Sequence, residues 1–485
     1  MACSCLGCVD GRGCEAPNES LDPVSGSINT PVTTSTVASP GSGSALEGIQ
    51  GITAFGDGNP NTVTTITYHF DTGLGVYGLT TNVWQQFEKD AYREALDAIE
   101  AIANINFVEV ANVNNADFVE FTTSDSGFTY LGYHEGPSTA ASFGNSYGIY
   151  DDPTWTSNND AAGGFFFSVI LHELMHGLGL GHPHDDGFGS TVMDGVNYPF
   201  NDYGDFNLNQ GVYTVMSYNE GWHSENGNLL GSASWGNTLG LAALDIAALQ
   251  AMYGANAATG AGATTYVMQT INSAGIGYQA IWDSGGVDEI TYNGSGNATI
   301  NLSAATLDYS ATGGGVVSHV AGILGGFTIA NGVVIENASG GSGNDGITGN
   351  SANNTLNGND GHDVLNGRGG IDTLYGGEGD DVLIGGGGAD AIHGGAGVDT
   401  LSFVGASGGM TLQFLTADSG NVYAGEPIGF DTFTGIENIW AGEQADTIGM
   451  SDGDNVVNGN GGNDVIFGWS GNDTLYGDAD NDFLF

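Results

Sequence analysis

The sequence predicts a two-part molecule, in which an α+β domain is followed by an all-β domain that forms a parallel β-roll. Two observations carry this prediction. Up to about residue 256, alternating apolar segments typical of strands are mixed with segments whose apolar residues recur at helical spacing. From Gly340 a strict nine-residue repeat takes over, and helical periodicity is absent beyond residue 257.

The composition limits what the chain can do. Its 485 residues are enough for two or three domains, and its 40% of hydrophobic residues can supply a core for each. Acidic residues number 56 against 4 basic ones, so we expect no binding to nucleic acid and a preference for cations. The longest apolar run, residues 161–171, is too short to span a bilayer, so we expect no membrane insertion.

The first 48 residues differ from the rest of the chain. Residues 15–48 are rich in Ser, Thr, Pro and Gly, and all cysteines precede them at Cys3, Cys5, Cys8 and Cys14. We expect residues 1–48 to form a disordered N-terminal extension that acts as a propeptide. The sequence leaves the role of the cysteines open, including a thiolate that caps a metal, and it leaves the propeptide cleavage site open. No N-terminal signal peptide is evident.

Residues 49–256 form the predicted α+β domain. Its strand-like segments are residues 66–70, 107–110 and 118–123, and its helical segments are residues 83–105 and 239–253. Gly254 follows the last helix in a position suited to a C-cap. The segment FTYLGYH, residues 128–134, predicts either an edge strand to which a substrate could add or an ordinary strand of the sheet.

The stretch HELMHGLGLGHP, residues 172–183, predicts a metal site. His172 and His176 are four residues apart, so a helix places both imidazoles on one face. Gly179 can adopt a left-handed conformation that ends the helix and lets His182 return as a third ligand. Three imidazoles and one open position suit catalytic zinc, and Glu173 can take a proton from a water that zinc activates.

Residues 257–485 form the predicted β-roll, and the nine-residue repeat carries this prediction. The repeat fills blocks at about residues 340–403 and 441–485, and in the first block Ile or Leu follows two positions after each Asp or Asn position. Each copy supplies one short strand with an inward apolar side chain and one glycine-rich turn. The aspartates predicted to bind calcium are Asp345, Asp363, Asp372, Asp381, Asp390, Asp399, Asp464, Asp473 and Asp482.

Calcium is the cation that this repeat favours, because it takes six to eight oxygen ligands and the turns offer carboxylates and backbone carbonyls. Without the ion the stacked carboxylates repel one another, so we expect the roll to fold when calcium binds, at dissociation constants of roughly 10⁻⁴ to 10⁻³ M. Asn354 and Asn455 replace the aspartate in two copies, and Arg368 replaces a glycine in another, so we expect weaker half-sites there. The number of occupied sites stays open.

The metal motif followed by Pro183 resembles the signature of the metzincins, and among them the serralysin-type zinc metalloproteases of peptidase family M10B, which carry RTX calcium-binding repeats. YTVMSY, residues 213–218, resembles the Met-turn of that family. The resemblance implies that Met216 packs beneath the zinc ligands and that Tyr218 contacts zinc at rest and stabilises the oxyanion during the reaction. It extends over roughly residues 60–405, but the cysteine-containing extension departs from the family pattern.

The resemblance implies a metalloendopeptidase of the EC 3.4.24 class, with one catalytic Zn²⁺ and several structural Ca²⁺ ions. It implies a zymogen that leaves the cell through the type I secretion machinery, is extracellular and acts on protein or peptide substrates; we expect a monomer. Substrate preference and the natural end of the chain stay open. The alternative is a calcium-dependent surface or adhesive RTX protein with a vestigial protease domain, and the complete set His172, Glu173, His176, His182 and Tyr218 argues against it.

Overall fold

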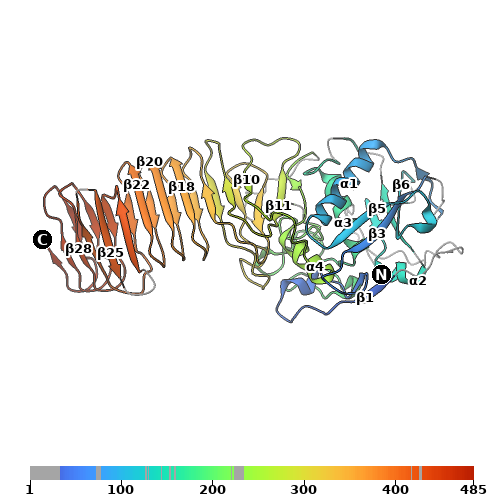
Figure 1. The fold of residues 1–485 in the computed structure, drawn as a ribbon, viewed down its shortest axis with the longest axis horizontal. Coiled ribbons are helices and arrows are strands. Elements are labelled where there is room, and N and C mark those ends of the chain that lie inside the picture. Colours follow the sequence, from blue (N-terminus) through green and yellow to red (C-terminus); the bar gives the residue numbers. More distant parts are fainter. Residues whose placement is uncertain are drawn as a thin grey trace.

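The computed structural model describes residues 33–485, except residues 73–77, 126–127, 129, 144, 152–154, 158–159, 220, 223–233, 417 and 425–428. The molecule is elongated, with an α+β domain at one end and a long stack of β-strands extending from it (Figure 1). The fold class predicted from the sequence, an α+β domain followed by a parallel β-roll, is thereby confirmed. The four cysteines lie outside the described residues.

A six-stranded sheet forms the centre of the α+β domain, in the order β5-β3-β6-β8-β7 with β4 paired to β6. Strands β3, β5, β6 and β8 run parallel, and β7 runs antiparallel to β8 at the edge of the sheet. The strand bounds are β3 Thr64–Phe70, β4 Thr81–Asn82, β5 Ile105–Glu109, β6 Phe118–Thr123, β7 Gly132–His134 and β8 Ser146–Asp151. Every residue of β6 is buried, as expected for a central parallel strand.

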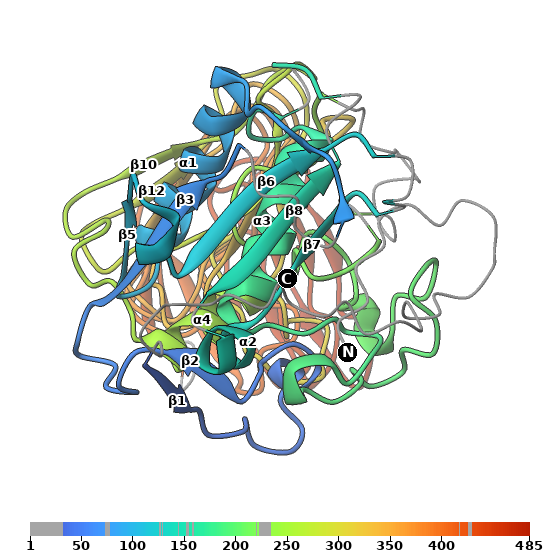
Figure 2. The ribbon, with the colours of Figure 1, turned by 90° about the vertical axis from the view of Figure 1, so that its right-hand side faces the viewer.

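Four α-helices belong to this domain, and one of them, α3, lies behind β6 and β8 in Figure 2. Their bounds are α1 Gln86–Glu100, α2 Pro137–Phe143, α3 Phe165–Leu178 and α4 Ala243–Tyr253. Short 3-10 turns are η1 Ala45–Gly48, η3 Val113–Asn115, η4 Gly187–Gly189 and η5 Asp205–Asn207. Almost all of α3 is buried, because helix and sheet share one apolar core.

The prediction of a disordered extension up to residue 48 is wrong for residues 33–48. Strand β1 (Thr34–Thr36) pairs with β2 (Thr53–Phe55), and η1 is largely buried against the domain core. The chain here also supports the loop after α3, because Gly181 N donates to Ile49 O and Thr191 N donates to Glu47 O. Removal of this segment would expose the core, so we expect any propeptide to end before residue 45.

The β-roll consists of two sheets of 12 strands each, and in one of them the end strand β9 and its neighbour β11 contact α3 and α4 of the α+β domain. In the repeat region, strands pair in parallel with the strand 18 residues further on, for example Leu356 with Leu374 and Leu365 with Leu383. One coil of the roll therefore contains two nine-residue repeats. The inward Leu and Ile side chains from Ile347 to Ile466 are fully buried, which explains why the sequence keeps them at a fixed position.

The first sheet of the roll, in spatial order, contains β10 Thr265–Val267, β12 Glu289–Thr291, β16 Asn337–Ser339, β18 Thr355–Asp360, β20 Thr373–Glu378, β22 Ala391–Ala396, β26 Phe430–Thr434, β25 Ser419–Ala424, β24 Met410–Phe414, β28 Thr447–Gly449, β30 Val465–Phe467 and β32 Phe483–Leu484. The second contains β31 Thr474–Tyr476, β29 Val456–Asn458, β27 Asn438–Trp440, β23 Thr400–Ser402, β21 Val382–Ile384, β19 Val364–Asn366, β17 Gly346–Thr348, β13 Ala298–Asn301, β14 Ser318–Val320, β15 Gly326–Ile329, β11 Gly277–Ile281 and β9 Asn237–Thr238. Both sheets run the length of the roll.

The interruption between the two repeat blocks does not break the roll. Strands β24 and β25 form an antiparallel hairpin that is inserted into the first sheet between β26 and β28. Beside this hairpin, β26 pairs in parallel with β22, and β27 pairs in parallel with β23. The coils therefore continue through a region in which the sequence shows no repeat.

Candidate metal centre

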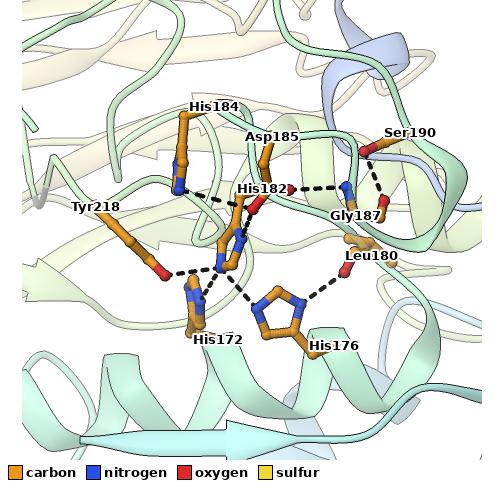
Figure 3. A network of polar contacts seen from close by, with 9 residues as sticks. All are labelled: His172, His176, Leu180, His182, His184, Asp185, Gly187, Ser190 and Tyr218. Carbon is orange, nitrogen blue, oxygen red and sulfur yellow. Dashed lines mark hydrogen bonds and ion pairs between the residues drawn. The ribbon is translucent and has the colours of Figure 1, made fainter. Parts of the chain in front are cut away.

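Helix α3 supplies the first two histidines of the predicted metal site. His172 and His176 are 1% and 0% exposed, and their rings project from the same face of the helix (Figure 3). The helix ends at Gly179, whose φ of 105° is left-handed, as the sequence predicted. Its N–H donates to His176 O, and the chain then turns so that His182 faces the helix.

The three imidazoles meet at their Nε2 atoms. His182 Nε2 lies 3.2 Å from His172 Nε2 and 2.9 Å from His176 Nε2. Each Nδ1 atom has a different partner, because His172 Nδ1 lies 2.8 Å from Val215 O and His176 Nδ1 lies 2.8 Å from Leu180 O. His182 Nδ1 lies 2.9 Å from Asp185 Oδ2.

These contacts fix where the ring protons are. Carbonyl and carboxylate oxygens accept hydrogen bonds, so each Nδ1 donates and each neutral ring keeps a lone pair on Nε2. Burial lowers the pKa of His172 to about 4 and the pKa values of His176 and His182 well below the ordinary value, which favours the neutral rings. Three Nε2 lone pairs thus face one another, an arrangement that a cation such as Zn²⁺ would satisfy.

Tyr218 and Met216 come from the segment that resembles a Met-turn. The hydroxyl of Tyr218 lies 3.1 Å from His182 Nε2, and Met216 is fully buried. Asp245 of α4 holds this segment in place, because its carboxylate accepts from Thr214 Oγ1 and Val215 N and also from Ala242 N. Burial raises the pKa of Asp245 to about 6. No local pattern in the sequence points to Asp245, because its partners in the Met-turn lie about 30 residues away.

Glu173 is buried beside the imidazoles and has one oxygen without a partner. The side chain is 2% exposed, its carboxylate accepts a hydrogen bond from the backbone N–H of His134, and Oε2 has no hydrogen-bond partner. Burial, and next the charge of Glu120, raise its pKa well above the ordinary value. A carboxylate with a raised pKa and a free oxygen can accept and return a proton.

His184 and Asp185 were not among the predicted site residues, but both lie at the metal centre. Asp185 orients His182 through Nδ1 and also accepts from Gly187 N at 2.9 Å. The side chain of His184 is 10% exposed and its ring packs against His182 and Tyr218. A signal for Asp185 existed, because a carboxylate near a metal-binding histidine commonly orients it.

The predicted calcium aspartates form two regular ladders along the roll. In each, Oδ1 accepts the backbone N–H of a residue on the preceding coil, at 2.6–3.0 Å. The second oxygen, Oδ2, is buried without a hydrogen-bond partner in Asp363, Asp372, Asp381, Asp390, Asp399 and Asp464. Burial raises the pKa of Asp363 and Asp372 to about 7. These orphaned oxygens fit a bound cation.

Glycines shape the space around these oxygens. A Cβ atom at Gly358 would collide with Asp363 Oδ2 and with the carbonyl oxygen of Gly376, and Gly367 and Gly376 repeat this arrangement one and two copies on. The small cradle is therefore lined by a carboxylate and by a carbonyl of the next coil, which is the oxygen set that Ca²⁺ prefers. The structure thus supports the predicted ligand type.

Two acidic residues that the sequence analysis missed continue the ladders across the inserted hairpin. Asp431 Oδ1 accepts from Asp390 N at 2.9 Å, and Glu437 Oε2 accepts from Asp399 N at 2.8 Å. Burial raises the pKa of Asp431 to about 7, and its Oδ2 has no hydrogen-bond partner. Their spacings of 41 and 38 residues from their partners hid them from a search for the nine-residue period.

The architecture is that of a zinc metallopeptidase. One helix carries two histidines and a glutamate, a third histidine follows a glycine turn, and a roll of the calcium-binding type follows the domain. Comparison with known proteins agrees. Residues 62–210 match the matrixin family, and residues 339–374, 366–401 and 451–484 match the RTX calcium-binding nonapeptide repeat. The chain thus combines a matrixin domain of the M10 peptidases with RTX repeats, and the serralysin resemblance noted in the sequence is confirmed.

Among similar proteins are "Serralysin" of Proteus mirabilis, 33% identical over 58% of this chain and 58% of that protein, and "Metallopeptidase AprA" of Pseudomonas marginalis, 30% identical over 60% and 61%. "Serralysin B" of Dickeya chrysanthemi is 33% identical over 50% of this chain and 49% of its own length. The chain spans about half to three fifths of the length of these relatives. No helix among the described residues is long and apolar enough to cross a membrane.

Proposed function

We propose that this chain is a secreted zinc-dependent endopeptidase that hydrolyses internal peptide bonds of proteins. The observation that carries the proposal is the meeting of three neutral imidazoles at their Nε2 atoms, together with the buried carboxylate of Glu173, which has a free oxygen and belongs to the same helix as two of the histidines. Such a set has no use in a merely structural core, because three buried lone pairs without a partner are costly. The similarity to serralysins supports the same class of reaction.

His172, His176 and His182 would hold the zinc ion, and the hydroxyl of Tyr218 lies beside the same point. Zinc in such a site acts as a Lewis acid that acidifies water and polarises a carbonyl. Val215 O, Leu180 O and Asp185 keep the three rings in the orientation that this role requires. Met216 is fully buried in the core of the domain and would pack beneath the histidines.

Glu173 and Tyr218 carry the proposed chemistry. Glu173 would take the proton that water loses as it adds to the peptide carbonyl, and would then deliver that proton to the departing amine nitrogen. Tyr218 would donate a hydrogen bond to the carbonyl oxygen as negative charge develops on it. Both roles depend on the position of side chains that are 2% and 5% exposed and therefore well fixed.

A protein substrate would lie along β7 as an added antiparallel strand. This strand pairs with β8 on one side only and ends the sheet, so its other edge is free of strand pairing among the described residues. Edge strands bind extended peptides through main-chain hydrogen bonds, and a peptide placed here would pass Glu173. This placement agrees with the first of the two interpretations of residues 128–134.

We further propose that calcium binds the aspartate ladders and that the roll folds outside the cell, after export of the chain by the type I secretion machinery. The orphaned Oδ2 atoms support the calcium part of this proposal, because their burial without an ion is unfavourable. Calcium would thus be a structural cofactor. The enzyme would act as a monomer.

The test is Glu173→Gln. The variant should retain one zinc per chain while casein cleavage falls by about 100- to 10,000-fold, because a general base is lost and the zinc ligands are kept. Glu94→Gln, on the exposed side of α1, is the matched control and should cleave like the wild type. Full casein cleavage by Glu173→Gln would contradict the mechanism. Wild-type protein that binds zinc and calcium but cleaves neither casein nor gelatin would favour the adhesive alternative.

A further inference from the structure

Behind the metal centre, the α+β domain buries a second acid and base pair, Glu120 of β6 and His134 of β7. Neither side chain is exposed at all, and His134 Nε2 lies 3.0 Å from Glu120 Oε1. His134 Nδ1 lies 2.8 Å from the carbonyl oxygen of Glu135. Burial opposes the charged form of His134, but the Glu120 carboxylate outweighs it and the pKa of His134 is raised. Both ring nitrogens can then donate, as in an imidazolium.

Two glycines, Gly148 and Gly177, make the space that this pair fills. A Cβ atom at Gly148 of β8 would collide with Glu120 Oε2 and lie 2.8 Å from His134 Cδ2. A Cβ atom at Gly177 of α3 would lie 2.7 Å from His134 Cε1. The ring of His134 also packs edge-to-face on Phe118. The pair is therefore held from the sheet and from the helix that carries Glu173.

Stability alone does not explain a buried ion pair. Desolvation of two charges largely cancels their attraction, so well-packed apolar side chains of similar volume usually stabilise a fold as well or better. A buried pair is expected where one geometry must be selected over others.

His134 connects the buried pair to Glu173. Its side chain bonds to Glu120, and its backbone N–H donates to the carboxylate of Glu173. Gly132, two residues earlier on β7, lies so close to Glu173 that a side chain there would collide with it. Strand β7 is three residues long and, among the described residues, pairs with β8 alone, so the contacts of the His134 side chain help to fix the position of this N–H.

We propose that Glu120 and His134 are positioning residues that fix β7 against Glu173 and so set the orientation of the catalytic carboxylate. The inference rests on the proposed function, because Glu173 is the proton carrier in it. Glu120 acts only through His134 and does not touch substrate. Loss of the pair leaves the zinc ligands in place but lets β7 and the Glu173 carboxylate shift.

The test compares three variants by kcat and KM per zinc-loaded molecule. Glu120→Ala should lower kcat by about 10- to 100-fold, the effect of a displacement of about 1 Å, with KM within about twofold and zinc content unchanged. Glu120→Gln should restore most of kcat, because an amide can still bond the imidazole. Thr122→Ala is the matched control, since Thr122 lies two residues further along β6, is fully buried, and its hydroxyl has no hydrogen-bond partner.

A second measurement keeps the proposal testable without catalysis. In Glu120→Ala, backbone amides of residues 131–135 should exchange with deuterium at least tenfold faster than in the wild type, whereas those of β5, the opposite edge strand, should not change. A kcat for Glu120→Ala equal to that of Thr122→Ala, or unchanged exchange at β7, would overturn the proposal. If wild-type protein cleaves nothing, the proposed function fails, and the exchange measurement still decides whether the pair fixes β7.

Discussion

The two domains treat buried carboxylates differently. Near the metal centre, Asp185 and Asp245 each use both oxygens in hydrogen bonds to side chains or backbone N–H groups of the domain itself. Along the roll, Asp363, Asp372 and Asp381 use only Oδ1, and Oδ2 is buried without a partner. The α+β domain therefore supplies its own partners to the carboxylates that hold His182 and the Met-turn, whereas the roll leaves these three aspartates with one oxygen that a cation would satisfy.

The difference also appears in how the two domains are held together. The α+β domain has a mixed core in which α3, α4 and the sheet contribute large aromatic and aliphatic side chains. The roll has one inward Leu, Ile, Val or Phe per strand and repeats of glycine and aspartate between them. Calcium should therefore matter far more to the roll than zinc matters to the fold of the α+β domain.

Calcium removal is expected to have the largest effect. With EGTA at pH 8 the strands of the repeat region should unfold, because repulsion among the aspartates is then uncompensated, and calcium should restore them at roughly 10⁻⁴ to 10⁻³ M. Far-UV circular dichroism during a calcium titration measures this transition. A roll that keeps its full strand signal in EGTA would contradict the proposed dependence of its fold on calcium.

Loss of Asp185 should weaken the binding of zinc but not that of calcium. Asp185→Ala should weaken zinc binding by about 10- to 100-fold, because His182 loses the carboxylate that orients its ring, and should leave calcium-driven folding unchanged. The neighbouring exposed Asp186→Ala is the matched control. Competition with a zinc chelator measures the affinities; equal zinc affinities for the two variants would show that Asp185 does not support the site.

Acid should partly replace calcium in the roll. The pKa values of Asp363, Asp372 and Asp431 are raised to about 7 by burial. A raised folded-state pKa favours the folded form at low pH, so stability of the calcium-free roll should increase as pH falls from about 7 towards 4. In EGTA, strand signal should therefore be greater at pH 5 than at pH 8. A calcium-free roll that is equally unfolded at both values would contradict this account.

The smallest effect is expected from single glycines. Gly358→Ala should destabilise the calcium-loaded roll by about 1 to 3 kcal/mol and remove part of one calcium site, because the methyl group would meet Asp363 Oδ2. Gly346→Ala is the matched control, since nothing lies within 4 Å of a Cβ atom there. Thermal unfolding at fixed calcium compares them. Equal melting temperatures would show that the cradle around Oδ2 is not needed.

Local rules made the fold class and the main candidate site predictable from the sequence. The spacing of His172 and His176 requires only helix geometry, and the nine-residue period requires only stacking of equal coils. Glu120 with His134, and Asp245 with the Met-turn, could not be predicted in this way, because each pair joins elements far apart in the chain. Residues 33–48 look like a linker by composition, yet tertiary contacts order them, among them the hydrogen bonds from Thr191 N to Glu47 O and from Ala45 N to Leu307 O.

X-ray absorption at the zinc edge of the purified protein tests the central claim most directly, because it reports the atoms bound to the metal independently of activity. The account predicts one zinc per chain with three imidazole nitrogens from His172, His176 and His182, and oxygen as the remaining ligand type. A protein without zinc, or a zinc ion with fewer than three imidazole ligands, would contradict it.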